Sequence, residues 1–187
     1  PVAPSEVDAV RRRHGLDRPF VLFAGTVEPR KNLRRLLSAY DRLGRRDVDL
    51  VLAGPDGWSE DLPDVAVRRL GFVPRGELDA LYAAATVVAY PSLREGFGLP
   101  VLEAMAQGAA VVTSATTSTA EVAGDAAALV DPLDVDDIAA ALARLIDDEG
   151  ERERLRAAAR ARAATYTWER TAAATVAAYQ RALGAAP

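Results

Sequence analysis

The sequence predicts an α/β protein built on a doubly wound, mostly parallel six-stranded sheet, followed by C-terminal helices. Short apolar runs recur from Phe20 to Val130, which is typical of strands covered on both faces. Segments with apolar residues at helical spacing separate several of these runs. Such alternation implies right-handed crossovers between parallel strands.

The order of the elements follows from these two patterns. The expected strands are 20–24, 50–53, 65–70, 86–90, 110–113 and 127–130. The expected helices are 5–14, 33–43, 77–85, 101–107, 135–147, 151–164 and 168–183. Asn32 is expected to cap the second helix, because asparagine is a favoured N-cap residue. In the last helix the candidate buried positions are Trp168, Val176, Tyr179 and Leu183.

The length of 187 residues predicts one main domain. We expect a linker with a short helix at 1–18, the main domain at 19–165 and a terminal helix at 166–187. His14, the only histidine, lies among arginines and is expected to be a solvated surface residue.

Composition excludes several classes of protein. The absence of cysteine excludes disulfides, thiolate nucleophiles and iron–sulfur ligation. A net charge of -4 gives no indication of nucleic-acid binding. No apolar run reaches the ~18 residues of a membrane span. We expect a cytoplasmic protein that binds no nucleic acid.

The glycine- and proline-rich loops predict where the site lies. In a parallel sheet the loops that follow the strands gather at one edge, and ligands bind there. Residues 25–31, 54–57, 71–74 and 92–100 are loops of this kind. We therefore expect the functional site at this edge.

The segment 95–103 has the strongest signal. Gly96 and Gly98 permit backbone angles closed to other residues and close approach of a ligand, while Pro100 suits the first helical position. A helix N-terminus after a strand is a ready anion site. The same residues would also suit a tight strand-to-helix turn that binds nothing.

Arg30 and Lys31 immediately precede a helix, whose positive dipole end disfavours cations. A bound anion, with a diphosphate as the obvious candidate, would turn this repulsion into attraction. Of the 23 basic residues Lys31 is the only lysine, which points to a place where a compact ammonium is needed. The alternative is that both side chains bend away into water.

Two carboxylates bracket the glycine loop. Glu103, expected in the first turn of its helix, could accept hydrogen bonds from a ribose diol. Glu95 could bind a sugar or act as a base. The spacings G-x-G-x-x-G and G-x-x-x-x-G-K-[ST] are absent, which argues against a nicotinamide site and a P-loop, and no cluster of metal ligands stands out.

These motifs resemble those of the nucleotide-binding half of retaining GT-B glycosyltransferases of family four. Glu95-x7-Glu103, with Gly-Phe-Gly-Leu-Pro inside it, is similar to that family's E-x7-E motif. Residues 25–32 resemble its first phosphate-binding loop, in a form common among mannosyl- and rhamnosyltransferase-like members. Thr26 departs from the family, in which many members carry Arg there. Further similar segments are 71–73, 118–122 and 166–169.

The resemblance implies a role for each matching position. Lys31 and Arg30 would hold the diphosphate, together with the backbone amides of Gly98 and Leu99. These groups would stabilise the leaving diphosphate in place of a divalent cation, so no metal and no cofactor is expected, and the nucleotide diphosphate sugar is the donor substrate.

Three further positions follow from the same resemblance. Glu103 would bind the ribose hydroxyls, Glu95 the donor sugar, and the main chain at Val73 the base. Glu95, Lys31 and Arg30 are thus the candidate catalytic residues.

The resemblance also implies a larger enzyme. The family has an N-terminal acceptor-binding domain, through which any membrane contact would be made, and a last helix that crosses back to that domain. We therefore expect this chain to bind a nucleotide sugar, with GDP-mannose favoured, and to transfer sugar poorly alone. We also expect the last helix either to expose an apolar strip or to refold against its own domain or a neighbour. The alternatives are a non-catalytic nucleotide- or anion-binding module and half of a sugar-nucleotide epimerase.

Overall fold

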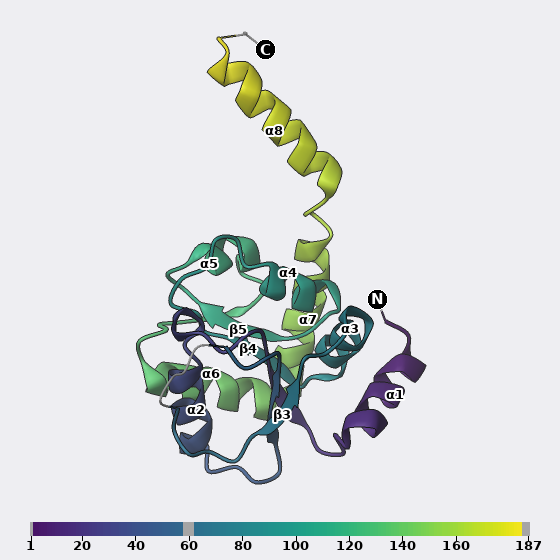
Figure 1. Ribbon diagram of the computed structural model, residues 1–187, viewed down its shortest axis with the longest axis vertical. Coiled ribbons are helices and arrows are strands. Elements are labelled where there is room, and N and C mark those ends of the chain that lie inside the picture. Colours follow the sequence, from purple (N-terminus) through teal and green to yellow (C-terminus); the bar gives the residue numbers. More distant parts are fainter. Residues whose placement is uncertain (1, 58–61, 185–187) are drawn as a thin grey trace.

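The computed structural model describes residues 2–57 and 62–184 and confirms the predicted fold class (Figure 1). Six strands form one sheet in the order β3-β2-β1-β4-β5-β6, and every neighbouring pair is parallel. The strands are β1 (Phe20–Ala24), β2 (Asp49–Ala53), β3 (Arg68–Gly71), β4 (Val87–Tyr90), β5 (Val111–Ser114) and β6 (Ala128–Val130). The sheet is therefore parallel throughout.

Helices cover both faces of the sheet. Helix α2 (Leu33–Arg42) packs beside α6 (Val135–Asp147) on one face. On the other face α1 (Pro4–His14) packs on α3 (Arg75–Ala84), and α4 (Leu99–Ala106) contacts both α3 and α5 (Ser118–Ala123). Helix α7 (Glu149–Ala163) contacts α4 and α6, and α8 (Trp168–Ala182) projects from the body (Figure 1).

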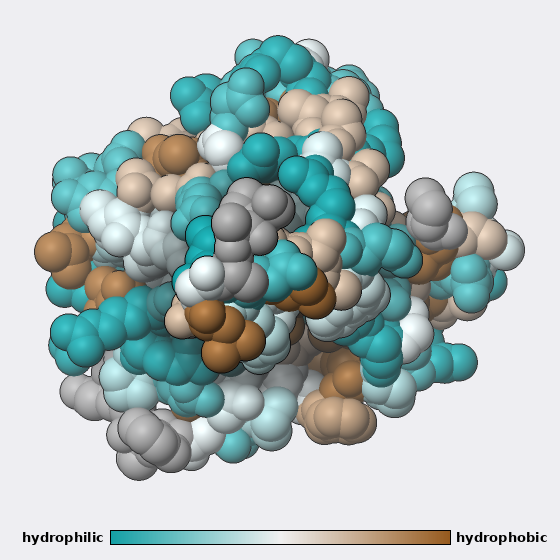
Figure 2. Space-filling model, turned by 90° about the horizontal axis from the view of Figure 1, so that it is seen from above, coloured by the Kyte–Doolittle hydropathy of each residue, from teal (hydrophilic) through white to brown (hydrophobic). Residues whose placement is uncertain are grey.

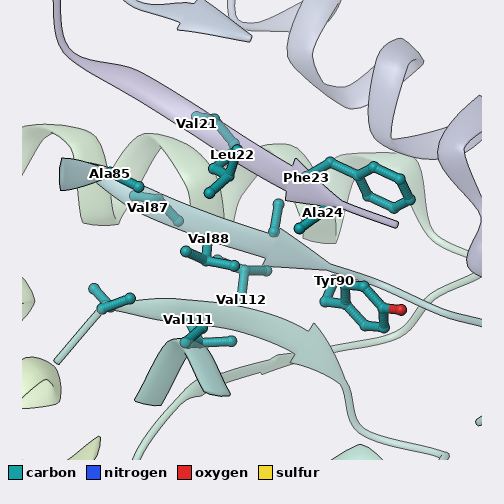
Figure 3. Close-up of a cluster of buried hydrophobic side chains, with 14 of the residues drawn as sticks. Val21, Leu22, Phe23, Ala24, Ala85, Val87, Val88, Tyr90, Val111 and Val112 are labelled. Carbon is teal, nitrogen blue, oxygen red and sulfur yellow. The ribbon is translucent and has the colours of Figure 1, made fainter. Parts of the chain in front are cut away.

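The core lies along the central strands, as their continuous apolar runs predict. The side chains of β1, β4 and β5 interdigitate in Figure 3, and all are nearly inaccessible. At the carboxyl end of the two central strands, the rings of Phe23 and Tyr90 stack with centroids 5.8 Å apart. This ring pair thus lies directly beneath the loops that were predicted to form the site.

Two short helices lie in segments where the sequence predicted no helix. Pro29–Lys31 forms a 3-10 turn, η1, and Ser118–Ala123 forms α5. Both are too short to show an apolar periodicity. In α5 the signal is the cap, because the Thr117 hydroxyl accepts a hydrogen bond from the Thr119 backbone amide.

The burial predicted for the last helix is wrong. Trp168 is 84% exposed, and Val176, Tyr179 and Leu183 are exposed as well. No described residue of α8 is buried, because the helix leaves the body instead of packing on it. The predicted apolar strip is therefore confirmed. From the end where α8 projects, the surface shows separate apolar groups among hydrophilic ones (Figure 2). The final residues, 185–187, lie outside the described part, as does Pro1.

The prediction for His14 is also wrong. Its side chain is only 19% exposed, and its Nε2 lies 3.1 Å from Glu77 Oε2 on α3. Glu77 also accepts a hydrogen bond from Arg13. These contacts and the buried side chains of Val10 and Leu16 attach the first helix to the body.

Among the helices of the described residues, none is both long and apolar enough to cross a membrane.

Candidate functional site

The two central strands, β1 and β4, lie side by side and lead to helices on opposite faces of the sheet. The strand order reverses at this point, and the loops that follow β1 and β4 flank the crevice where ligands of such folds bind. The backbone amide of Leu93 donates a hydrogen bond to the carbonyl oxygen of Arg30 (2.7 Å). The loop predicted to hold Arg30 and Lys31 is therefore joined to the loop that carries Glu95.

Asn32 strengthens this junction, and in a way that the sequence did not indicate. It precedes α2 as predicted, but its side chain makes no cap hydrogen bond. Its amide group instead donates to the carbonyl oxygens of Pro91 (2.8 Å) and Pro132 (2.6 Å). Among the described non-glycine residues only Asn32 has a positive φ, at 61°, a backbone region that asparagine tolerates better than most residues.

Arg30 lies between two carboxylates. Its Nε is 2.7 Å from Glu28 Oε2, and its Nη1 donates to Glu95 Oε2 at 2.9 Å. These two acidic partners explain why Arg30 is tolerated before a helix. The sequence predicted a bound anion in that role. The guanidinium therefore fixes the orientation of Glu95, and its predicted contact with a diphosphate stays a prediction.

Lys31 is the more unusual cation, because its side chain is buried: the residue is 7% exposed. Its ammonium lies against Gly25, where a Cβ would collide with Nζ. Within the described residues it forms no ion pair. Burial lowers the pKa of Lys31, the charge of Arg30 lowers it further, and Glu28 and Glu95 oppose the shift only in part. An incoming anion would relieve this cost of holding a desolvated charge.

Glu95 has one satisfied oxygen and one unsatisfied oxygen. Its side chain is 9% exposed, and Oε1 is buried without a hydrogen-bond partner in the described part of the chain. The phenol of Tyr90 lies close by: burial raises its pKa and the charge of Glu95 raises it further, so the hydroxyl stays protonated. The site thus contains a buried acceptor suited to a hydroxyl donor.

Helix α4 begins at Leu99, two residues earlier than predicted. Gly98 precedes it with φ at 101°, and a Cβ there would approach Thr119 Cγ2 to 2.8 Å, so this position requires glycine. The sequence predicted Glu103 in the first turn of this helix. Because the helix starts early, Glu103 lies in its second turn. Leu99 and Glu103 are four residues apart and share a face of the helix.

Glu103 meets the start of the neighbouring helix. Its Oε1 accepts a hydrogen bond from Arg75 Nη1 at 2.5 Å. Arg75 is the first residue of α3, two positions after Val73, whose side chain is buried while that of Phe72 is exposed. The predicted ribose and base positions are therefore linked through Arg75, a residue that the sequence gave no reason to single out.

A cavity of about 370 Å³ separates the glycine loop from the beginning of α8. The ring of Phe97 meets that of Tyr166 edge to face, with centroids 6.1 Å apart. Leu99 and Trp168 also line this space and are exposed. The outer side of the candidate site is thus apolar and open.

No group of three or more potential metal ligands occurs within residues 2–57 and 62–184.

Comparison with known proteins places this geometry in a family. The model of the group 1 glycosyl transferases matches residues 6–162. The chain is 41% identical over 193 residues to O-antigen chain mannosyltransferase B of Escherichia coli. The alignment covers 96% of this chain and 51% of that protein. It is 38% identical over 176 residues to the MMP alpha-(1->4)-mannosyltransferase of Mycolicibacterium hassiacum. That alignment covers 87% of this chain and 43% of that protein.

Solved structures agree on the fold. Sucrose-phosphate synthase from Thermosynechococcus elongatus superposes with a TM-score of 0.78 at 28% identity, covering 96% of this chain and 49% of that one. Anabaena HepE, in complex with UDP and glucose, superposes with a TM-score of 0.81 at 23% identity. The superposition covers 97% of this chain and 53% of that one. The chain spans about half the length of the relatives it matches. It belongs to the group 1 glycosyl transferase family.

Proposed function

We propose that this chain is the donor-binding half of a glycosyltransferase that moves a mannosyl group from a nucleotide diphosphate mannose to an acceptor, with retention at the anomeric carbon. The two relatives named above are mannosyltransferases, which favours mannose, and GDP-mannose is the donor we favour. The chain spans about half of each relative, so the acceptor would bind to a second domain.

One observation carries the proposal. The buried ammonium of Lys31 and the buried Oε1 of Glu95 lie in the same loop junction. Within the described residues the first forms no ion pair and the second has no hydrogen-bond partner. A buried charge without an ion pair and an unsatisfied buried acceptor are both costly, and they are typical of sites that a ligand completes. A diphosphate would complement the first group and a sugar hydroxyl the second.

The diphosphate would lie between Lys31 and the N-terminus of α4, where the amides of Gly98 and Leu99 are available to an anion. Arg30 would add its positive charge from the side of Glu95. Each well-placed donor contributes about 3 kcal/mol to stabilising the charge that develops on a leaving group. Together they would supply the stabilisation that a divalent cation provides elsewhere, so we propose a metal-independent transfer.

The nucleoside would extend from this point toward α3. Glu103 would accept hydrogen bonds from the ribose hydroxyls, and the main chain at Val73 would bind the base. On the other side Glu95 would hold the donor sugar, and the departing phosphate would assist the acceptor.

The last helix would cross to the second domain and cover its apolar strip there. Residues 166–187 would then serve as the connection between the two halves, and 19–165 as the donor domain. The isolated chain would bind nucleotide but transfer sugar poorly, because the acceptor is not held. Steady turnover of GDP-mannose by this chain on a defined acceptor would contradict this.

Calorimetry with GDP and UDP tests the site directly. Lys31→Ala is expected to weaken nucleotide binding about 100-fold, which corresponds to the loss of one well-placed charged donor. Glu103→Ala should weaken it less, because the ribose contact is uncharged on the ligand side. Arg154→Ala, which removes an exposed ion pair on α7, is the control and should bind as the parent chain does. Binding that ignores both site substitutions would end the assignment.

Glu95 is tested in the two-domain enzyme. Glu95→Ala there should abolish transfer and leave nucleotide affinity nearly intact, because the sugar and not the nucleotide contacts this residue. Unchanged transfer would instead favour a module that binds nucleotide without catalysis.

A further inference from the structure

The guanidinium of Arg75 connects the start of α3 to the second turn of α4. Its Nη1 donates to Glu103 Oε1 at 2.5 Å, and its Nε donates to Asp79 Oδ1, one turn along its own helix, at 3.2 Å. The Asp79 contact holds the planar group at one end and directs the other end at Glu103. Two carboxylates from two helices thus fix one side chain.

This contact contributes little to the stability of the fold. Arg75 is 62% exposed, and ion pairs in such solvated positions are worth about 0–1 kcal/mol. Helices α3 and α4 are already in contact, and each is anchored by buried side chains, such as Tyr82 on α3 and Met105 on α4. A role in the site accounts better for an arginine at this position.

Only one oxygen of Glu103 is engaged. A carboxylate has about four acceptor positions, and Arg75 fills one of them on Oε1. Oε2 has no hydrogen-bond partner among the described residues. The charged donor restricts the rotation of the carboxylate, so that its remaining acceptor positions point in a fixed direction.

We propose that Arg75 is a positioning residue for the nucleoside, which holds the Glu103 carboxylate oriented for the ribose hydroxyls of the donor. The inference rests on the proposed function, because it requires Glu103 to bind a ribose. Arg75 acts through Glu103 and does not touch the phosphates. Its effect should therefore depend on the 2′-hydroxyl of the ligand.

The test is calorimetry on this chain with GDP, UDP, their 2′-deoxy forms and inorganic pyrophosphate. The parent chain should bind the ribonucleotide more tightly than the deoxynucleotide. In Arg75→Ala we expect ribonucleotide affinity to fall about fivefold, as for the loss of an exposed charge-assisted hydrogen bond. The ratio between ribo- and deoxynucleotide should shrink by a similar factor, with pyrophosphate affinity unchanged.

Three further variants separate positioning from a general effect. Arg75→Lys keeps the charge without the planar fork and should recover part of the ribonucleotide affinity. The double variant Arg75→Ala/Glu103→Ala should bind no more weakly than Glu103→Ala alone, because both act through one contact. Arg154→Ala, with 60% exposure and a comparable ion pair, should leave the ratio unchanged.

The outcomes distinguish this inference from the proposed function. A ratio that Glu103→Ala abolishes and Arg75→Ala leaves intact would overturn the role of Arg75 and leave the donor site standing. A matching loss of pyrophosphate affinity in Arg75→Ala would overturn it too, because Arg75 would then be a phosphate contact. If the parent chain binds neither GDP nor UDP, the proposed function falls, and this inference with it.

Discussion

The side-chain amide of Asn32 donates a hydrogen bond to the carbonyl oxygen of Pro132, 100 residues later in the chain, at 2.6 Å. The same amide reaches Pro91 at the end of the central strand β4. One buried residue therefore connects the first loop of the site, the end of β4 and the segment before α6.

This arrangement predicts that Asn32→Ala destabilises the chain by about 2–4 kcal/mol, since two buried hydrogen bonds are lost and alanine is strained at positive φ. Asn32→Gly tolerates the backbone and should lose less. Urea unfolding of both variants measures the difference. Equal losses would contradict a contribution from the left-handed backbone.

We predict that the buried charge of Lys31, which the proposed function requires, lowers the free energy of unfolding. Because burial lowers its pKa, the unfolded chain binds more protons than the folded chain between the lowered pKa and 10.5, so the free energy of unfolding rises with pH across that window. Lys31→Met should be more stable than the parent by about 1 kcal/mol at neutral pH. The advantage should shrink toward pH 10.5. Unfolding curves that keep a constant separation from pH 7 to 10.5 would refute the buried charge.

The two glycines of the loop predict opposite outcomes. Gly98→Ala should cost about 1–3 kcal/mol and weaken nucleotide binding, because φ is positive and the new methyl group meets Thr119. Gly96→Ala faces open space and should change stability by less than about 0.5 kcal/mol. Thermal unfolding of the two variants, measured side by side, tests this difference. Similar losses of stability at both positions would count against the geometry at Gly98.

Helix α8 predicts that part of the chain is dispensable for folding. A chain without residues 168–187 should lose less than about 0.5 kcal/mol of stability, because no described residue of α8 is buried. Leu155→Ala on α7, whose side chain is 1% exposed, should cost about 2–4 kcal/mol and serves as the contrast. A truncation that unfolds the chain would show that α8 packs on the body.

The sequence predicted the sheet well and the side chains of the site only in part. Continuous apolar runs identify buried strands because both faces are covered, and the glycine loops follow at the carboxyl ends of those strands. The apolar stripe of α8 was identified too, but a periodic pattern does not specify what covers it, and its predicted burial was wrong. Likewise Asn32 reads as an ordinary cap, because its partners lie 59 and 100 residues away.

Arg75 illustrates the same limit at the site. Its partner Glu103 is 28 residues distant, and the two meet only because α3 and α4 lie side by side on one face of the sheet. A local sequence pattern therefore cannot predict the contact between Arg75 and Glu103. Glu103 also lies two residues further from the start of its helix than predicted, since α4 begins at Leu99.

Two contacts join the first two loops of the site: the Leu93 amide donates to the Arg30 carbonyl, and the Arg30 guanidinium donates to the Glu95 carboxylate. They have a consequence for engineering the proposed donor site. A chimera that imports either loop from another transferase would separate an arginine from the acid that it was matched to. The two loops should therefore be exchanged as a pair, together with Asn32, as one transplantable unit.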